Sequence, residues 1–106
     1  MKNKKMILWL ALTVMAIVPV YAQQYDSESD FYTDADKNVN GGVIIKSYLG
    51  SNKEVRIPPS IQNNPVTGIG EKAFRDNKNI ISVIIPNGVI SIGYEAFFGC
   101  QLTRLL

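Results

Sequence analysis

Apolar residues in the second half of the chain follow a phrase that occurs twice. The phrase Ile-Gly-x-x-Ala-Phe occupies residues 69–74 and returns at residues 92–97, 23 positions later. Self-similarity with a period of about 20 to 50 residues is typical of solenoids, in which each unit buries its apolar side against a neighbouring copy. The pattern therefore predicts a repeat protein or a piece of one.

A second phrase, Val-x-Ile-Pro, precedes each copy at residues 55–58 and 83–86. Its valine and isoleucine are two positions apart, so both side chains point to one side of an extended strand, and the proline ends that strand. Each unit is predicted to run from a strand through a short helical turn or coil, around Glu71 to Arg75 in the first unit, to the next strand. Stacked units would form a parallel sheet on one face.

The two units differ in length at one place. Eight steps separate Pro58 from Val66, but only three separate Pro86 from Val89. Residues 63–65 (Asn-Asn-Pro) favour a turn, so the five extra residues are expected to leave the coil as a small loop.

Residues 31–57 are predicted to form an N-terminal cap. Two apolar runs, 43–49 and 54–57, are joined by Gly-Ser-Asn-Lys at residues 50–53, which favours a β-hairpin between them. End units of a solenoid are atypical because they shield the stacked core from water. The preceding residues, 23–30, are polar and are expected to be a flexible segment.

Residues 1–22 have the features of a secretory signal peptide. Three lysines lie within residues 1–5, residues 6–20 carry no charge, and Val-Tyr-Ala precedes the cleavage point predicted after Ala22. An uncleaved membrane anchor is the alternative, but the apolar stretch is shorter than the ~20 residues that span a bilayer.

Removing the signal peptide changes the charge of the chain. From Gln23 onward eight Lys and Arg stand against nine Asp and Glu, a net charge of −1, because three of the eleven basic residues lie before Ala22. A nucleic-acid-binding domain would need clustered positive charge on its folded part. The composition therefore gives no support to that class of protein.

Residues 36–41 (Asp-x-Asn-x-Asn-Gly) match the first half of an EF-hand calcium loop. The twelfth position of such a loop, normally a bidentate glutamate, is Ser47 here. A polar hairpin loop is therefore the favoured interpretation, and no metal site is assigned. A small calcium-dependent module stays as an alternative.

No catalytic residue and no cofactor are predicted. The chain has no histidine, so its single cysteine, Cys100, lacks the usual imidazole base. Cys100 takes the place that Asn77 holds in the preceding unit, which favours a buried structural position over intermolecular pairing or a reactive thiol. Most carboxylates lie between Asp26 and Asp36, in a polar stretch that cannot hold the fixed separation of an acid–base pair.

The outward side of the predicted strands is the candidate protein-binding surface. Arg56 and Ile84 are the outward positions of the two Val-x-Ile phrases, and Glu54 and Ser82 precede them by two residues. Repeat proteins bind partners through such extended surfaces. Each of the four could equally be an ordinary sheet-surface residue.

The order of these phrases resembles the BspA-type leucine-rich repeat, whose consensus is close to L-x-x-V-x-I-P-x-x-V-x-x-I-G-x-x-A-F-x-x-C in about 23 residues. The resemblance covers Glu54 to Leu106. It implies a leucine-rich-repeat solenoid, mainly β with short helical turns, with about one and a half units in residues 58–106 behind the β-hairpin cap. It also implies an exported or cell-surface bacterial protein that catalyses no reaction and binds other proteins, host surface or matrix proteins among them, in adhesion.

The chain departs from the family pattern in the longer first unit and in the absence of a third. After Leu105 the pattern calls for another apolar residue and a proline, but the sequence ends at Leu106. Fewer than about three units seldom bury enough apolar surface to offset chain entropy. A truncated remnant of a longer surface repeat protein, without independent activity, is therefore the alternative to a binding module.

Overall fold

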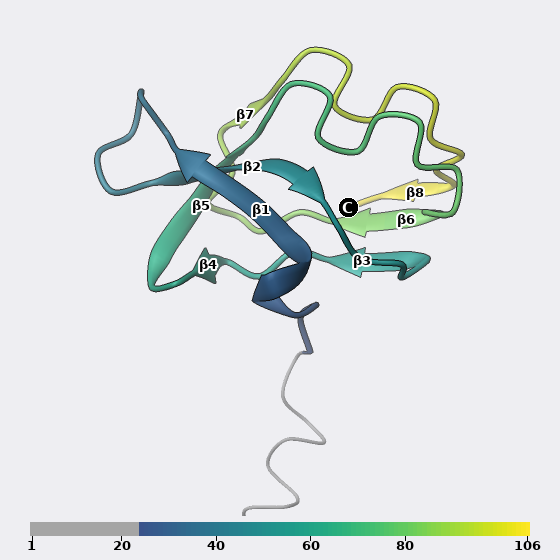
Figure 1. The fold of residues 1–106 in the computed structure, drawn as a ribbon, viewed down its shortest axis with the longest axis horizontal. Coiled ribbons are helices and arrows are strands. Elements are labelled where there is room, and N and C mark those ends of the chain that lie inside the picture. The colour runs from purple at the N-terminus through teal and green to yellow at the C-terminus, as the bar shows by residue number, and fades with distance from the viewer. Residues whose placement is uncertain (1–23) are drawn as a thin grey trace, which may run out of the picture.

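The computed structural model describes residues 24–106. The predicted signal peptide, residues 1–22, lies outside the described residues. Figure 1 shows successive coils of chain stacked on one another, with the strands of each coil lying beside those of the next.

A short 3-10 helix, η1 (Glu28–Asp30), opens the described part of the chain. The strands that follow are β1 (Phe31–Ala35), β2 (Val43–Tyr48), β3 (Glu54–Arg56), β4 (Ser60–Ile61), β5 (Asn64–Ile69), β6 (Ser82–Ile84), β7 (Ser91–Ile92) and β8 (Arg104–Leu105).

The strands form two sheets. Sheet A has the order β1-β2-β5-β4, with β7 also paired to β5, and sheet B has the order β3-β6-β8 (Figure 1). Val55 pairs with Val83 and Val83 with Leu105, all in parallel strands. The prediction that the Val-x-Ile segments stack in parallel is therefore confirmed.

The Ile-Gly phrase supplies a second parallel sheet, which the sequence analysis did not predict. Ile45, Ile69 and Ile92 occupy one register position across β2, β5 and β7. Each coil thus contributes one strand to sheet A and one to sheet B. The apolar core fills the space between the two sheets.

The core consists of side chains that alternate inward from both sheets. Val55, Val66 and Val83 are fully buried, and Phe74 and Ile80 lie beside them in the same cluster. Burying one such side chain stabilises the fold by ~1.5–3 kcal/mol. Four aromatic rings extend the core along the stack in the order Phe31, Tyr48, Phe74, Phe97, with centroids 5.4, 5.6 and 5.1 Å apart.

The segment around Glu71 to Arg75 is a run of tight turns. The N–H of Ala73 donates to the carbonyl of Gly70 and that of Arg75 to the carbonyl of Lys72, both at 3.2 Å. Lys72 has φ +59° and Asp76 has φ +60°, a left-handed conformation that a right-handed helix does not contain. These residues explain why the expected short helical turn or coil takes the form of successive turns and does not continue into a helix.

The N-terminal cap contains a hairpin, but its strands differ from the predicted ones. β1 pairs antiparallel with β2 across the polar loop of residues 36–42. The run 54–57, expected to pair with 43–49, instead begins sheet B. The assignment of Gly50–Lys53 as the hairpin turn was therefore wrong, because pairing β3 with β6 buries Val55 against Val83 in the stacked core.

The five extra residues of the first unit form a second hairpin, between β4 and β5. Gln62 and Asn63 at its tip have φ +50° and +65°. Two successive left-handed residues are the signature of a type I′ turn, whose twist matches that of paired strands. The expected small loop is thus an ordered two-stranded ribbon.

Candidate protein-binding face

The four residues predicted for the binding surface lie together on sheet B. Glu54 pairs with Ser82, and Arg56 pairs with Ile84, in the parallel register of β3 and β6. Val55 and Val83, between them in the strands, are fully buried in the core. Because side chains alternate along a strand, the four point to the opposite side, which we call the outer face of sheet B.

The four residues are not equally accessible. Glu54 and Arg56 are exposed and Ile84 is half-buried, whereas Ser82 is only 8% exposed. Ser82 sits in the middle strand, flanked in register by Glu54 and Arg104. Ser82 therefore lies where the sequence placed it, but its neighbours leave little of it for a partner to touch.

Strand β8 extends the face with Arg104, which the sequence analysis missed. The exposed Arg104 continues the row that begins at Glu54 and passes through Ser82. Leu105 was already aligned with Val83 by the repeat pattern, so the residue before it could have been assigned to the same row. Arg104 was missed because its strand is only two residues long and the sequence ends directly after it.

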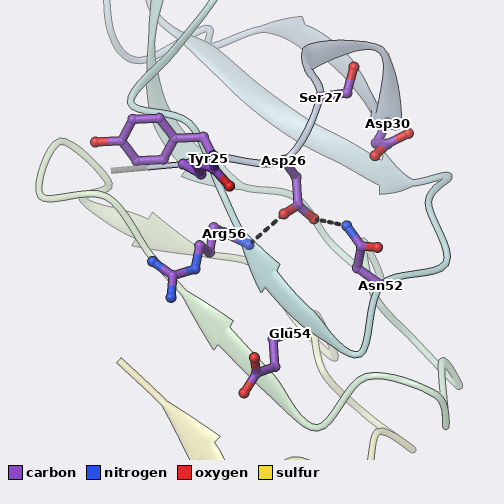
Figure 2. A pocket seen from close by; sticks show the side chains of 8 residues that line it. Tyr25, Asp26, Ser27, Asp30, Asn52, Glu54 and Arg56 are labelled. Atoms are coloured by element: carbon purple, nitrogen blue, oxygen red, sulfur yellow. Dashed lines mark hydrogen bonds between the residues drawn. The ribbon is translucent and has the colours of Figure 1, made fainter. Parts of the chain in front are cut away.

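The N-terminal segment borders the face at the edge of β3. Asp26 donates its N–H to the carbonyl oxygen of Arg56 at 2.9 Å, and its Oδ1 accepts the N–H of Arg56 at 3.3 Å. The other carboxylate oxygen accepts the Asn52 amide at 3.1 Å and the Tyr48 hydroxyl at 3.3 Å. Residues 23–30 were expected to be flexible, but four hydrogen bonds at Asp26 hold the described part of this segment against β3 and the residues before it. Figure 2 shows two of them, to Arg56 and to Asn52.

Tyr48 is positioned by the same cluster. Its hydroxyl donates to Asp26 and accepts the N–H of Asn52 at 3.1 Å. Burial raises the pKa of this hydroxyl, and the Asp26 and Asp30 carboxylates add to the rise against the hydrogen bond from Asn52. The hydroxyl therefore stays protonated and keeps its donor role.

A shallow polar hollow of about 800 Å³ lies between the N-terminal segment and β3. Its lining is Gln24, Tyr25, Asp26, Ser27, Asp30, Asn52, Glu54 and Arg56. In Figure 2 the side chains of Tyr25 and Arg56 extend to the same side of the strand, and Glu54 lies further along it. The hollow thus joins the N-terminal segment to the predicted binding residues.

A smaller and more apolar groove of about 290 Å³ lies beside this hollow. Its lining is Tyr25, Ile57, Pro59, Ile84, Ile85, Pro86, Asn87 and Gly88. Tyr25 lines both spaces, so it stands between a polar and an apolar part of the same face. Tyrosine and arginine are enriched among residues that dominate binding energy at protein interfaces.

The calcium-like loop serves as a hairpin connection. The Asp36 carboxylate accepts the N–H of Asn38 at 2.9 Å and the Thr67 hydroxyl at 2.7 Å. These two hydrogen bonds, the one from Thr67 first, lower the pKa of Asp36. Its oxygens are thus used to fold the loop and to fasten it to β5. Among residues 24–106, no group of three or more His, Cys, Asp or Glu is arranged to hold a metal ion.

Cys100 is half-buried in the last coil. Its Sγ donates to the carbonyl oxygen of Phe74 at 2.9 Å. Burial raises the pKa of this thiol, which keeps it protonated. The alignment with Asn77 predicted a buried structural position, and the structure shows a half-buried one.

No helix within the described part of the chain has the length and apolar character needed to cross a membrane. This finding does not extend to residues 1–23.

Comparison with protein families matches residues 47–106 to the BspA type leucine rich repeat region (6 copies). Comparison with curated proteins finds no match. The T. pallidum leucine rich repeat protein (TpLRR) has a similar structure, with 31% identity and a TM-score of 0.73 over 77% of this chain and 38% of that one.

Two further solved structures are similar. A leucine-rich repeat protein from Bacteroides capillosus is 30% identical, with a TM-score of 0.64 over 78% of this chain and 64% of that one. A leucine rich cell surface protein from Faecalibacterium prausnitzii is 24% identical, with a TM-score of 0.66 over 79% of this chain and 23% of that one, and shows the fold alone.

The chain therefore spans less than two thirds of each of these proteins. The matched family region begins at Ser47, in β2, and so includes strands of both sheets. The phrases that define the repeat in the sequence are the segments that stack in the structure. This chain belongs to the BspA-type leucine-rich-repeat family.

Proposed function

We propose that this chain is a non-catalytic module that binds other proteins through the outer face of sheet B. The observation that carries the proposal is the alignment of Glu54, Arg56, Ile84 and Arg104 in neighbouring register positions. Tyr25, at the edge of this face, adds an aromatic side chain between a polar hollow and an apolar groove. Together they offer charged, aromatic and aliphatic contacts on one side of the molecule.

We further propose that the chain is exported and acts at the cell surface or outside the cell. Residues 1–22 have the lysines, the uncharged stretch and the cleavage residues of a signal peptide. Amino-terminal sequencing of the product from an exporting bacterial host should start at Gln23. A product that keeps Met1 would contradict this proposal.

Host surface or matrix proteins are the proposed partners. Purified fibronectin, laminin and collagen would be passed over the immobilised chain, with binding followed by surface plasmon resonance. Arg56→Glu reverses one charge of the face, on strand β3. It should weaken binding about tenfold or more, because a partner surface that is complementary to Arg56 would then meet a charge of its own sign.

A matched control has the same charge change away from the face. Lys78→Glu alters an exposed residue in the turns between β5 and β6, and it should leave binding unchanged. An equal loss of binding in both variants would show that binding depends on the net charge of the chain and not on this face. Absence of binding to all three proteins would reject matrix adhesion as the role of this chain.

A further inference from the structure

The outer face of sheet B and the N-terminal segment together form a trough. The polar hollow beside β3 and the apolar groove beside β6 adjoin at Tyr25, which lines both. The groove lies between Ile57 and Pro59 of one coil and residues 84–88 of the next. Within the described chain, no residue of β8 lines either space. The trough is therefore built by the N-terminal segment and two successive coils.

At Arg56 the backbone of β3 is closed to an added strand. The N–H of Asp26 donates to the carbonyl oxygen of Arg56 at 2.9 Å, and the Asp26 Oδ1 accepts the N–H of Arg56 at 3.3 Å. Recognition by strand addition depends on such main-chain groups. A partner that lies in the trough is therefore recognised through its side chains.

The exposed charges of β3 have a fixed order and spacing. Glu54 and Arg56 are both exposed and lie two residues apart, on the outer face of one strand. Two residues of a strand span roughly 6–7 Å. Within residues 24–106, the ion pairs form on the turns of residues 71–76 and at Glu95, so neither Glu54 nor Arg56 belongs to one. Both charges can therefore form ion pairs with a partner.

The groove that follows these charges accepts an apolar side chain. Ile84 is the register partner of Arg56, and both Ile84 and Pro86 are half-buried. No charged residue of the described chain lines the groove. An apolar side chain is stabilised there by the surface it buries, whereas a charged one loses hydration. Because Ile57 and Pro59 follow Arg56 in the chain, the trough presents an anion, a cation and an apolar surface in that order.

We propose that the trough binds an extended segment of a partner protein with the complementary order: a lysine or arginine, an aspartate or glutamate two positions away, and then an aliphatic residue or proline. In an extended segment, side chains two positions apart lie on one side with the same spacing as Glu54 and Arg56. The basic residue faces Glu54, the acidic residue faces Arg56, and the apolar residue lies in the groove. This inference rests on the proposed function and names the class of partner segment that the same face accepts.

Selection of short random peptides displayed on phage tests this inference, with the chain from an exporting host as the bait. The selected peptides should be enriched in the predicted order of charges. One variant that combines Glu54→Arg with Arg56→Glu exchanges the two charges and keeps the net charge of the chain. It should weaken the binding of these peptides about tenfold or more in fluorescence anisotropy. Synthetic peptides in which the basic and acidic residues are also exchanged should bind this variant again.

The matched control combines Glu71→Lys with Lys72→Glu. These two residues are exposed and lie outside the trough, so their exchange should leave peptide binding unchanged. Circular dichroism should show that both variants keep the fold. An equal loss of binding in the two variants would overturn the inference.

An Ile84→Asp variant separates this inference from the proposed function. Selected peptides that lose binding in Ile84→Asp but carry no such charge pair would overturn the inference and leave the proposed function standing. If neither Ile84→Asp nor the exchange of Glu54 and Arg56 weakens the binding of any selected peptide, the inference and the proposed function both fail.

Discussion

The Glu28 carboxylate accepts a hydrogen bond from the backbone N–H of Gln62, 34 residues later in the chain. Glu28 lies in η1, and Gln62 lies at the tip of the β4–β5 hairpin. The five extra residues of the first unit thus reach back to the N-terminal segment. This hydrogen bond joins the N-terminal segment to the β4–β5 hairpin, so each of the two holds the other in place.

The tip of this hairpin offers a test of its backbone conformation. Asn63 has φ +65°, and glycine adopts that conformation without strain. Asn63→Gly should raise the free energy of unfolding by about 0.5–1 kcal/mol in urea denaturation, because relief of the left-handed conformation outweighs the larger unfolded-state entropy of glycine. Asn64→Gly, in the adjoining strand, should lower it by a similar amount. A loss of stability in both variants would contradict the type I′ turn.

Asp26 should contribute more to stability than its neighbours in the acidic segment. Asp26→Ala removes three side-chain hydrogen bonds, to Tyr48, Asn52 and Arg56, and should lower the free energy of unfolding by about 1–3 kcal/mol. Asp30→Ala is the control, because the bond from Leu49 goes to the main-chain oxygen of Asp30. An equal loss of unfolding free energy in both variants, measured by chemical denaturation, would show that the negative charge stabilises the fold and these hydrogen bonds do not.

The aromatic stack should dominate the core. Phe74 is 2% exposed and lies between the rings of Tyr48 and Phe97. Phe74→Ala should destabilise the fold by about 3–5 kcal/mol through lost burial and the cavity it leaves. Phe98→Ala, at a 57% exposed ring, should cost less than about 1 kcal/mol. A small effect at Phe74 would show that the coils do not share this core.

Close contact between coils requires glycine at position 93. A Cβ there would lie 2.5 Å from the backbone nitrogen of Glu71 in the neighbouring coil. Gly93→Ala should therefore lower the free energy of unfolding by about 1–3 kcal/mol, because backbone must shift to admit the methyl group. At Gly88 the nearest atom, the Val66 carbonyl oxygen, is 3.3 Å away. Gly88→Ala should cost less in the same thermal or urea unfolding experiment.

The hydrogen bond from Thr67 to Asp36 predicts a pH-dependent contribution to stability. It holds the pKa of Asp36 below its ordinary value in the folded chain. A depressed carboxyl pKa stabilises the fold above the unfolded-state pKa, and this stabilisation disappears as the pH falls through the folded-state pKa.

Thr67→Val removes the donor of this bond. The stability difference between wild type and Thr67→Val should be largest near neutral pH and should shrink in strongly acidic solution. Thr103→Val removes a hydroxyl that donates to the carbonyl oxygen of Ile81, so its effect should not change with pH. Parallel pH profiles for the two variants in urea denaturation would exclude the Asp36 contribution.

The spacing of the apolar residues predicted the stacked units, because the same short phrases recur in each unit. Val55 and Val83 occupy equivalent places in equivalent phrases, and the structure pairs them in register. The same argument placed Glu54, Arg56, Ser82 and Ile84 on one face. It could not show that Ser82 is nearly buried, because its exposure depends on what flanks it across the sheet.

The sequence by itself determined the coil, its period and the residues that line its interior, since those depend on repeated apolar positions a few residues apart. Only the tertiary structure decided which strand pairs with β2, that each coil adds a second sheet, and that Asp26 closes the edge of β3. The strand pairings depend on which segments pack side by side in the stack, and the Asp26 contacts are single hydrogen bonds to residues 22 to 30 positions away in the chain. No repeated pattern marks the Asp26 contacts, because each occurs once.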